Sequence, residues 1–452
     1  MNNEIEINKI PKRILNSLLL SVSAGVVPRI GAPYIAIGRK NEIGALLSDL
    51  EQIDQGCGTM RFIIGRYGSG KSFLMQLIRG YALEQNFITL DADLSPERRL
   101  YGSSGSGVAT YRELIKNMAS KSSPDGAALP KIIARWIDML KSELMAEGVS
   151  PDGADFADKL NLKAMDKLRD VEDMVGGFDF ARVISRYYLA YINGDDDTRS
   201  ACLRWLRGEF ATKTEARNQL GFATSVIIDD DNWYDFIKLW ASLVRFMGYR
   251  GLVVFIDECV NLYKITHRVS RENNYEKILS MFNDTLQGRA PGLALILGGT
   301  PQFMDDTRRG LFSYEALRSR LCDSKFSSEE YTNLLGPVIR LKRLSDDELF
   351  ALISRITKLY AVNYGIEPRI NEEQMIFFLQ RALSRAGADS MITPREMLRD
   401  YMTVLNILMQ NSDITFEQIM EKEPDGAAPK EKNEEKPEQG EKKRFSASDI
   451  EF

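Results

Sequence analysis

The sequence predicts an α/β protein with a parallel sheet at its centre and a helical domain toward its C-terminus. Three observations support this fold class. Residues 60–83 (MRFIIGRYGSGKSFLMQLIRGYAL) change from a strand pattern to a glycine-rich loop and then to a helical pattern, which is a β-loop-α unit. The stretches 251–258 (GLVVFIDE) and 292–300 (GLALILGGT) are apolar runs typical of buried parallel strands. Residues 346–410 then keep a largely helical pattern.

The remaining segments can be placed in order around these elements. A helix is expected over 9–25, a further buried strand over 87–94 (FITLDADL), and mostly helices between about 111 and 248. A short strand at 337–341 precedes a helix whose start is indicated by Ser345, with Glu348 three residues on. We therefore predict an N-terminal helix and loop (1–33), an α/β core (34–110 and 226–335), a helical insertion (111–225), a C-terminal helical domain of lid or winged-helix type (336–412) and a disordered tail (423–452).

Composition excludes several classes of function. The 452 residues carry 59 basic and 64 acidic side chains, a formal net charge of -5, so any DNA contact must use a local basic patch. Four scattered cysteines and a single histidine, His267, exclude a zinc site, a histidine-based triad and a disulfide framework. The apolar stretch near the N-terminus is too short to span a membrane and has no signal-cleavage pattern, so we expect a cytoplasmic protein without membrane contact.

Residues 65–72 (GRYGSGKS) fit the template G-x-x-x-x-G-K-S/T of a phosphate-binding loop, between a strand and a helix as the template requires. The glycines let the backbone wrap the phosphates, Lys71 reaches the β and γ oxygens, and Ser72 is the expected magnesium ligand. The alternative is a glycine-rich loop that matches by chance. We expect the nucleotide to contact Gly65, Arg66, Tyr67, Gly68, Ser69, Gly70, Lys71, Ser72 and Phe73, with Ile37, Gly38 and Arg39 covering the adenine.

Two carboxylates end the strand at 251–258 and favour ATP hydrolysis over other phosphate chemistry. Asp257 is positioned to hold magnesium, and Glu258 directly after it is the natural base for a hydrolytic water. Solvated carboxylates at a strand end are the alternative. Cys259 has no histidine or CxxC partner and is interpreted as a small buried residue.

Further polar residues suggest how hydrolysis is controlled. Thr300 ends the apolar strand 292–300, at the place where an AAA+ ATPase has its sensor-1 residue, although Gly-Gly-Thr-Pro could simply be a turn. Arg395 at a helix start is a candidate sensor-2 residue or an ordinary first-turn residue. Four arginines downstream of Thr300 are arginine-finger candidates, with surface salt bridges or DNA contacts as the alternative: Arg308, Arg309, Arg318 and Arg320.

These residues together carry a family resemblance. The strings GVVPRIG, YIAIGR, FIIGRYGSGKSFL, GYRGLVVFIDECVNLYK, RENNYEKILSMFNDTLQG and LILGGTPQFMDDTRRGLFSYEALRSRL resemble BrxC/BrxD-type P-loop ATPases of BREX phage-defence systems. The resemblance covers about residues 11–405, is weak in the helical insertion, and is closer in length to the BrxD type. It implies an AAA+ fold related to the Orc/Cdc6 and STAND groups, ATP and Mg²⁺ as cofactors, and an ATP-dependent role on DNA. Similar ATPases occur in other defence operons such as Shango, beside a helicase and a TerB-like protein.

The leading interpretation is an ATPase that forms a homo-oligomer and couples hydrolysis to DNA loading or to assembly with partner helicase or effector proteins. A nucleotide-gated signalling or scaffold ATPase without DNA binding remains the alternative, and a small-molecule P-loop kinase is the third. DNA contact would be double-stranded and of little sequence specificity. Its basic sources would be the helical insertion and five residues of the C-terminal domain: Lys342, Arg343, Arg381, Arg385 and Arg399.

The C-terminal tail combines a charged linker with a short apolar end. Residues 424–444 are rich in Pro, Gly, Glu and Lys, so the segment cannot offset its ordering entropy by burial. The final segment, FSASDIEF, again contains large apolar side chains (Phe445, Ile450 and Phe452). This pattern suggests a tethered docking peptide for a partner protein. Weak packing on the chain's own domain is the alternative.

Overall fold

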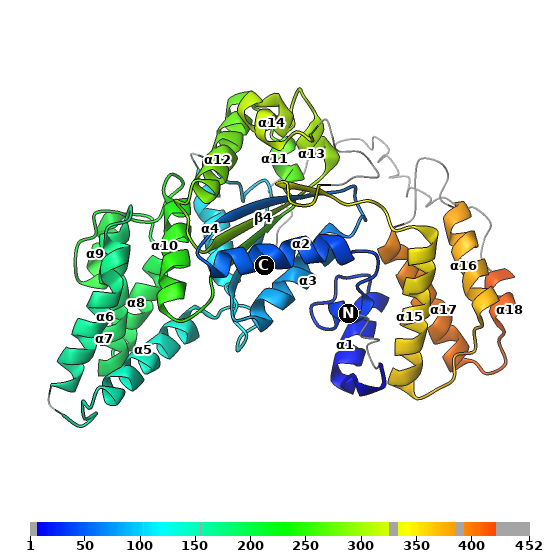
Figure 1. The fold of residues 1–452 in the computed structure, drawn as a ribbon, viewed down its shortest axis with the longest axis horizontal. Helices are drawn as coiled ribbons and strands as arrows, with labels where there is room; N and C mark the ends of the chain where they lie inside the picture. The colour runs from blue at the N-terminus through cyan, green and yellow to red at the C-terminus, as the bar shows by residue number, and fades with distance from the viewer. Residues whose placement is uncertain (1–6, 103, 154, 325–332, 386–392, 422–452) are drawn as a thin grey trace, which may run out of the picture.

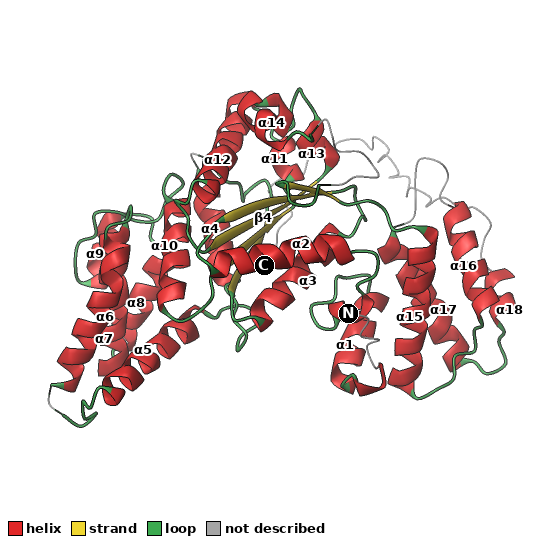
Figure 2. Ribbon diagram, viewed as in Figure 1, coloured by secondary structure: helices red, strands yellow, loops and turns green. Residues whose placement is uncertain are grey.

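The computed structural model describes residues 7–102, 104–153, 155–324, 333–385 and 393–421 (Figure 1). The predicted docking peptide lies outside these residues. In the described part, a central sheet lies between an arm of helices and a C-terminal helical bundle (Figures 1 and 2). No helix of the described residues is both long and apolar enough to cross a bilayer.

The sheet has five strands, all parallel, in the order β2-β3-β4-β1-β5. This confirms the predicted α/β class. The order places β4 between β1 and β3, so the segments that follow these three strands meet at one edge of the sheet. The strands are β1 (Thr59–Ile64), β2 (Ile88–Asp93), β3 (Leu252–Asp257), β4 (Leu293–Gly299) and β5 (Val338–Arg340).

The fifth strand moves one predicted boundary. We expected the C-terminal domain to begin at residue 336, but β5 pairs with β1 in the register Phe62 to Val338. The amide of Phe62 also donates to the carbonyl of Pro337 at 2.8 Å. Because β5 continues the sheet, the core extends to Arg340 and the C-terminal bundle begins after it.

Side chains alternate between the two faces of the sheet, as the period of a strand requires. In β3, Val253 and Phe255 pack against α2 (Lys40–Asp54) and α3 (Lys71–Glu84). Leu252 and Val254 belong to the larger buried cluster on the opposite face. That second face is covered by α4 (Ser106–Lys116), α10 (Trp233–Phe246) and α12 (Arg268–Leu286).

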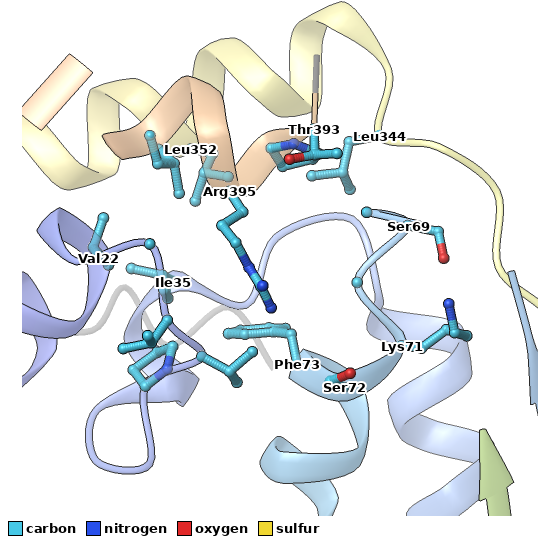
Figure 3. Close-up of a pocket in the computed structure, with 18 of the residues that line it drawn as sticks. Val22, Ile35, Ser69, Lys71, Ser72, Phe73, Leu344, Leu352, Thr393 and Arg395 are labelled. Atoms are coloured by element: carbon cyan, nitrogen blue, oxygen red, sulfur yellow. The ribbon is translucent and has the colours of Figure 1, made fainter. Parts of the chain in front are cut away.

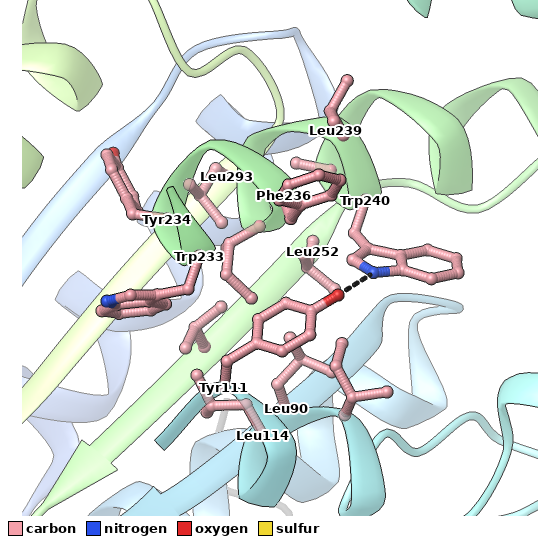
Figure 4. Close-up of a cluster of buried hydrophobic side chains, with 14 of the residues drawn as sticks. Leu90, Tyr111, Leu114, Trp233, Tyr234, Phe236, Leu239, Trp240, Leu252 and Leu293 are labelled. Atoms are coloured by element: carbon pink, nitrogen blue, oxygen red, sulfur yellow. Dashed lines mark hydrogen bonds between the residues drawn. The ribbon is translucent and has the colours of Figure 1, made fainter. Parts of the chain in front are cut away.

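The helical insertion shares this larger core with the sheet. The Tyr111 hydroxyl accepts a hydrogen bond from Trp240 Nε1 at 3.0 Å and donates one to the carbonyl of Leu206 at 2.8 Å (Figure 4). One buried cluster runs from the sheet into the insertion, which is therefore packed onto the core rather than tethered beside it. Its helices are α5 (Leu129–Ala146), α6 (Phe156–Glu172), α7 (Gly177–Asn193), α8 (Asp196–Leu206) and α9 (Lys213–Leu220).

The C-terminal bundle has its own core and includes the N-terminal helix. Leu15, Leu18 and Leu19 of α1 (Lys12–Ser23) are buried among the bundle helices. The helix α1 was expected in a separate N-terminal segment, but it packs against α15 and α17 because its apolar side chains form a continuous stripe. The bundle helices are α15 (Asp346–Tyr364), α16 (Glu372–Arg385), α17 (Pro394–Gln410) and α18 (Phe416–Glu421).

Short elements complete the fold. The predicted helix start at Ser345 is confirmed as a capping box in which Ser345 and Glu348 bond each other's backbone. A short 3-10 helix, η1, precedes α1, and a second one, η2, lies between α1 and α2. Further short helices follow β3 and β4 in the chain: α11, α13, η3 and α14. Their bounds are η1 (Ile7–Lys9), η2 (Ala32–Ile35), α11 (Val260–Tyr263), α13 (Pro301–Asp305), η3 (Leu311–Ser313) and α14 (Glu315–Leu321).

Candidate nucleotide site

A cavity of about 240 Å³ lies between the phosphate-binding loop and the C-terminal bundle (Figure 3). Segments that are distant in the sequence form its wall. They are the end of α1 with the segment that leads to α2, the loop after β1 with the start of α3, Glu258 after β3, and the starts of α15 and α17 with the residues just before them. The lining residues include Val22, Val27, Pro28, Ile35, Ile37, Arg39, Tyr67, Gly68, Ser69, Gly70, Lys71, Ser72, Phe73, Glu258, Leu344, Leu352, Thr393, Arg395 and Leu398.

Backbone geometry explains the glycines of the loop after β1. Gly68 and Gly70 have φ of 75° and 90°, a region that disfavours other residues. Gly70 is the N-cap of α3, so the first-turn amides of this helix open toward the cavity, where they can meet an anion. A Cβ on Gly65 would lie 2.2 Å from the Ser69 hydroxyl oxygen, so a larger residue would have to displace the Ser69 side chain.

Lys71 and Ser72 begin α3 and lie on the cavity wall. The Lys71 ammonium donates to the carbonyl of Gly65 at 3.0 Å and to that of Arg66 at 3.2 Å. Burial lowers the pKa of Lys71, and the charges of Asp257 and Glu258 oppose this shift. The ammonium is therefore held at the loop by carbonyl groups that a phosphate can replace.

The two predicted magnesium ligands are brought together. The Ser72 hydroxyl donates to the Asp257 carboxylate at 2.7 Å, across 185 positions of sequence. A hydroxyl and a carboxylate are the hard oxygen donors that Mg²⁺ takes, usually with one or two protein ligands and the remainder from water and phosphate. The donor set therefore fits the ion. A Cβ on Gly298 would lie 2.3 Å from Asp257 Oδ1, so β4 needs glycine there to leave room for the carboxylate.

Glu258 reaches the cavity from an unusual backbone conformation. Its φ is 56°, in the left-handed region that glutamate rarely adopts, and its amide donates to its neighbour Asp257 at 2.8 Å. Such conformations cost about 1 to 2 kcal/mol and persist where the surrounding structure enforces them. From this position Glu258 lines the same cavity as the loop after β1.

This strain predicts that Glu258→Gly raises the free energy of unfolding by about 1 kcal/mol, because glycine adopts the left-handed region without penalty. Glu258→Gln is the matched control, since it removes the charge but keeps the strained backbone. Chemical denaturation of both variants without nucleotide measures the difference. Equal stability of the two variants would show that no strain is stored at this position.

Asp93 is a site residue that our sequence analysis missed. It ends β2 directly beside Asp257 in the sheet register. Although Asp93 is exposed at the end of the strand, partial desolvation raises its pKa, and the nearby charges of Asp257, Glu258 and Asp91 raise it further against the opposing charge of Arg98. The signal was present in the sequence, because Asp93 ends an apolar strand in the same way as Asp257.

The raised pKa predicts that Asp93→Asn stabilises the nucleotide-free protein at neutral pH. The Asp93 carboxyl binds its proton more tightly in the folded state than in the unfolded state. Deprotonation of Asp93 therefore lowers the stability of the folded protein as pH rises through the folded-state pKa. The gain from Asp93→Asn should therefore be present above that pKa and vanish below the ordinary Asp pKa. Thermal unfolding across this pH range measures it, and a gain that grows toward acid pH would contradict the assignment.

The apolar part of the cavity comes largely from a segment to which we had assigned no role. Val22, Val27 and Pro28 line it beside the predicted Ile37, and Leu352 and Leu398 close it from the bundle. Our sequence analysis described residues 1–33 only as an N-terminal helix and loop. They reach it because α1 packs in the bundle, which places the following loop over the cavity.

Arg39 and Arg395 occupy different positions relative to the cavity. Arg39 is buried, and its guanidinium is bonded to the carbonyls of Ser69 and Lys342 and to the Glu42 carboxylate. Arg395 extends from the start of α17 toward Phe73, as Figure 3 shows. Arg395 therefore lies on the cavity wall, whereas the guanidinium of Arg39 is engaged by protein groups.

The remaining nucleotide-site candidates fall outside the lining or at its rim. Gly65 is buried beneath the loop and Arg66 is exposed, and neither lines the cavity. Tyr67 lines it with an 80% exposed side chain. Gly38 lies against the bundle, since a Cβ at this position would be 2.4 Å from Glu348 Oε1.

Thr300 lies between the strands that carry the loop and the carboxylates, as predicted, because β4 separates β1 from β3. Its hydroxyl oxygen accepts the amide of Phe303 at 3.3 Å and so caps α13. This bond uses one of the two acceptor sites of the hydroxyl and does not use its proton. Cys259 is fully buried and burial raises its thiol pKa, which agrees with an inert packing residue.

The four candidate finger arginines lie outside the cavity of their own chain. Arg309 donates to the carbonyls of Tyr263 and Ile265 at 3.2 Å each and is committed within the chain. Arg308 is exposed. Arg318 is exposed and lies 3.8 Å from Glu315, and the exposed Arg320 donates to a carbonyl of its own helix.

A parallel sheet with a glycine loop after β1 and a Ser72–Asp257 pair at its edge defines a P-loop nucleotide-binding protein. Residues 10–424 match the family described as BREX system ATP-binding protein BrxC/D, and the chain belongs to this family. The match covers most of the chain and confirms the resemblance seen in the motifs. Comparison with individually curated proteins gives no significant match.

Proposed function

We propose that the protein is a magnesium-dependent ATPase of the AAA+ class, closest to the BrxD type, that couples hydrolysis to DNA loading or partner assembly in bacterial phage defence. The observation that carries this proposal is the Ser72–Asp257 hydrogen bond at 2.7 Å with Glu258 on the same cavity wall. Membership of a family of ATP-binding proteins supports ATP as the nucleotide. We place the protein in the cytoplasm, where such partners act.

The site residues have separate roles in the proposed reaction. Lys71 and the first-turn amides of α3 would bind the β and γ phosphate oxygens. Ser72 and Asp257 would hold Mg²⁺, which neutralises phosphate charge. Glu258 would accept a proton from water as the water oxygen bonds to the γ phosphorus and the bond to the bridging oxygen breaks, leaving ADP and phosphate. Thr300 would orient this water.

We further propose that the active form is a homo-oligomer. The exposed Arg308, Arg318 and Arg320 follow β4 yet do not line their own cavity, so a neighbouring subunit's nucleotide is the site that they could serve. Arg395 would act within its own subunit. Arg309 is the weakest finger candidate of the four, because its guanidinium already donates to two carbonyls of its own chain.

DNA would be bound by a local basic surface, because the chain as a whole is acidic. Lys342 and Arg343 are exposed between β5 and α15, and Arg399 is exposed on α17, so all three are accessible to DNA. Arg381 lies on α16 and is half-buried, and the side chain of Arg385 lies outside the described residues. The partners that would share the DNA are other defence-operon proteins: a helicase, a TerB-like protein or BREX components.

One experiment separates the proposal from its alternative. ATP turnover per chain is measured against protein concentration, with and without duplex DNA at low salt. We expect turnover to rise more than linearly with concentration and to respond to duplex DNA, with little dependence on its sequence. Slow turnover that responds to neither would instead identify a nucleotide-gated scaffold, and no turnover with Mg²⁺ would exclude an ATPase.

A further inference from the structure

The buried Arg39 joins the phosphate-binding loop to the segment that leads into the C-terminal bundle. Its Nη2 donates to the carbonyl of Ser69 at 3.0 Å and to the carbonyl of Lys342 at 2.6 Å. Ser69 lies between the two left-handed glycines of the loop, and Lys342 lies between β5 and α15. Hydrogen bonds from a charged donor are roughly twice as strong as neutral ones, so both carbonyls are held firmly to one guanidinium.

The preceding residue touches the bundle directly. Gly38 has a φ of 72°, and a Cβ there would lie 2.4 Å from Glu348 Oε1 and 2.9 Å from Leu344 Cδ2. Glu348 is the residue that bonds back to Ser345 in the capping box of α15. The Gly38–Arg39 pair therefore packs against the first turn of α15, and a methyl group added at Gly38 would have to displace the ends of the Glu348 and Leu344 side chains.

A second contact connects the same loop to the other wall of the bundle. A Cβ on Gly68 would lie 2.3 Å from Thr393 Cγ2, at the N-cap of α17. Adjacent residues of the loop, Gly68 and Ser69, are thus linked to the starts of α17 and α15. Because these helices carry Arg395 and Leu352 on the cavity wall, a shift of the loop must be accommodated by the bundle.

We infer that Arg39 is a positioning residue that couples the conformation of the phosphate-binding loop to the placement of the C-terminal bundle. The inference rests on the proposed nucleotide function and adds a regulatory role to it. When phosphates draw the loop amides inward, the Ser69 carbonyl moves with them. Arg39 transmits that movement to Lys342, while Gly38 keeps the first turn of α15 in contact.

Amide hydrogen exchange of the full chain, with and without ADP and Mg²⁺, tests this coupling. In the wild type, ADP should slow exchange both in the loop (residues 66–76) and in the bundle entry (residues 343–352), the latter by about tenfold for a coupling of typical size. In Arg39→Gln the loop should still be protected by ADP, whereas the slowing at 343–352 should fall below about twofold.

The matched control is Glu42→Gln. It removes the ion pair to Arg39 at 3.2 Å but leaves both carbonyl contacts in place, so the response at 343–352 should stay as in the wild type. Gly38→Ala provides a second perturbation if Arg39→Gln does not fold. It should displace Glu348 and abolish the ADP response of the bundle entry while the loop still binds.

The outcomes separate the inference from the function on which it rests. A full ADP response at 343–352 in Arg39→Gln and in Gly38→Ala overturns the coupling. A wild-type chain whose loop is protected while 343–352 does not respond also overturns the coupling but leaves nucleotide binding intact. A loop that ADP does not protect in the wild type contradicts the proposed function itself.

Discussion

Glu258→Gln is expected to lower ATP turnover by about 10² or more while nucleotide binding is retained. The amide of glutamine is almost the same size as the carboxylate but cannot accept the proton of the attacking water. Asp257 accepts the Ser72 hydroxyl and would ligate Mg²⁺ in the proposed site, so we do not expect it to replace Glu258 as the base. Steady-state phosphate release measures turnover, and a fluorescent ATP analogue measures binding.

Two further variants control this experiment. Lys71→Ala should instead weaken ATP binding, because it removes the ammonium that bonds the loop carbonyls and reaches the phosphates. Asp93→Asn tests whether the neighbouring carboxylate can act as the base, and we expect its turnover to stay within about tenfold of the wild type. Hydrolysis by Glu258→Gln at the wild-type rate would show that Glu258 is not the base.

Asp49→Ala is expected to lower the free energy of unfolding by about 3 to 5 kcal/mol. Arg61 of β1 is bound bidentately by Asp49 of α2, with both N–O distances at 2.6 Å, and the two side chains are 8% and 6% exposed. Arg61 also donates to the carbonyls of Leu334 and Gly336, which precede β5. Removing Asp49 leaves the Arg61 charge buried without a counter-ion. Urea unfolding with ADP absent measures the change.

The same helix offers a matched control. Asp54 lies in an ion pair with Arg250 at 2.9 Å, but these side chains are 41% and 33% exposed. The hydrogen bond from Arg250 lowers the pKa of Asp54, yet solvent screens the pair, so Asp54→Ala should cost at most about 1 kcal/mol. Equal losses for the two variants would mean that burial does not decide the strength of the Asp49 pair.

The parts of the site that could be predicted from the sequence are mainly those formed by contiguous residues. A phosphate-binding loop needs glycines, Lys71 and Ser72 at short fixed spacing, so the local sequence specifies it almost completely. The pairing of Ser72 with Asp257 was also predictable, because the carboxyl ends of parallel strands meet at one edge of a sheet. Asp93 could have been found by the same rule, since it ends a strand in the same way.

Contacts between distant segments could not be predicted from the motifs. Arg39 follows a pattern associated with adenine binding, yet its guanidinium bonds Ser69 and Lys342, the latter 303 positions away in sequence. Val22 and Pro28 line the cavity only because α1 is buried against α15 and α17. Such placements depend on which apolar faces pack together, and many arrangements of helices satisfy the same amphipathic pattern.

The sequence by itself therefore determined the class of fold, the family, the loop at 65–72 and the carboxylates after β3, because each depends on local backbone geometry and short spacing. Only the tertiary structure decided that β5 completes the sheet, that α1 belongs to the C-terminal bundle, and that Arg39 connects the loop to that bundle. These features arise from packing free energy summed over many weak contacts between remote segments, which no single stretch of residues encodes.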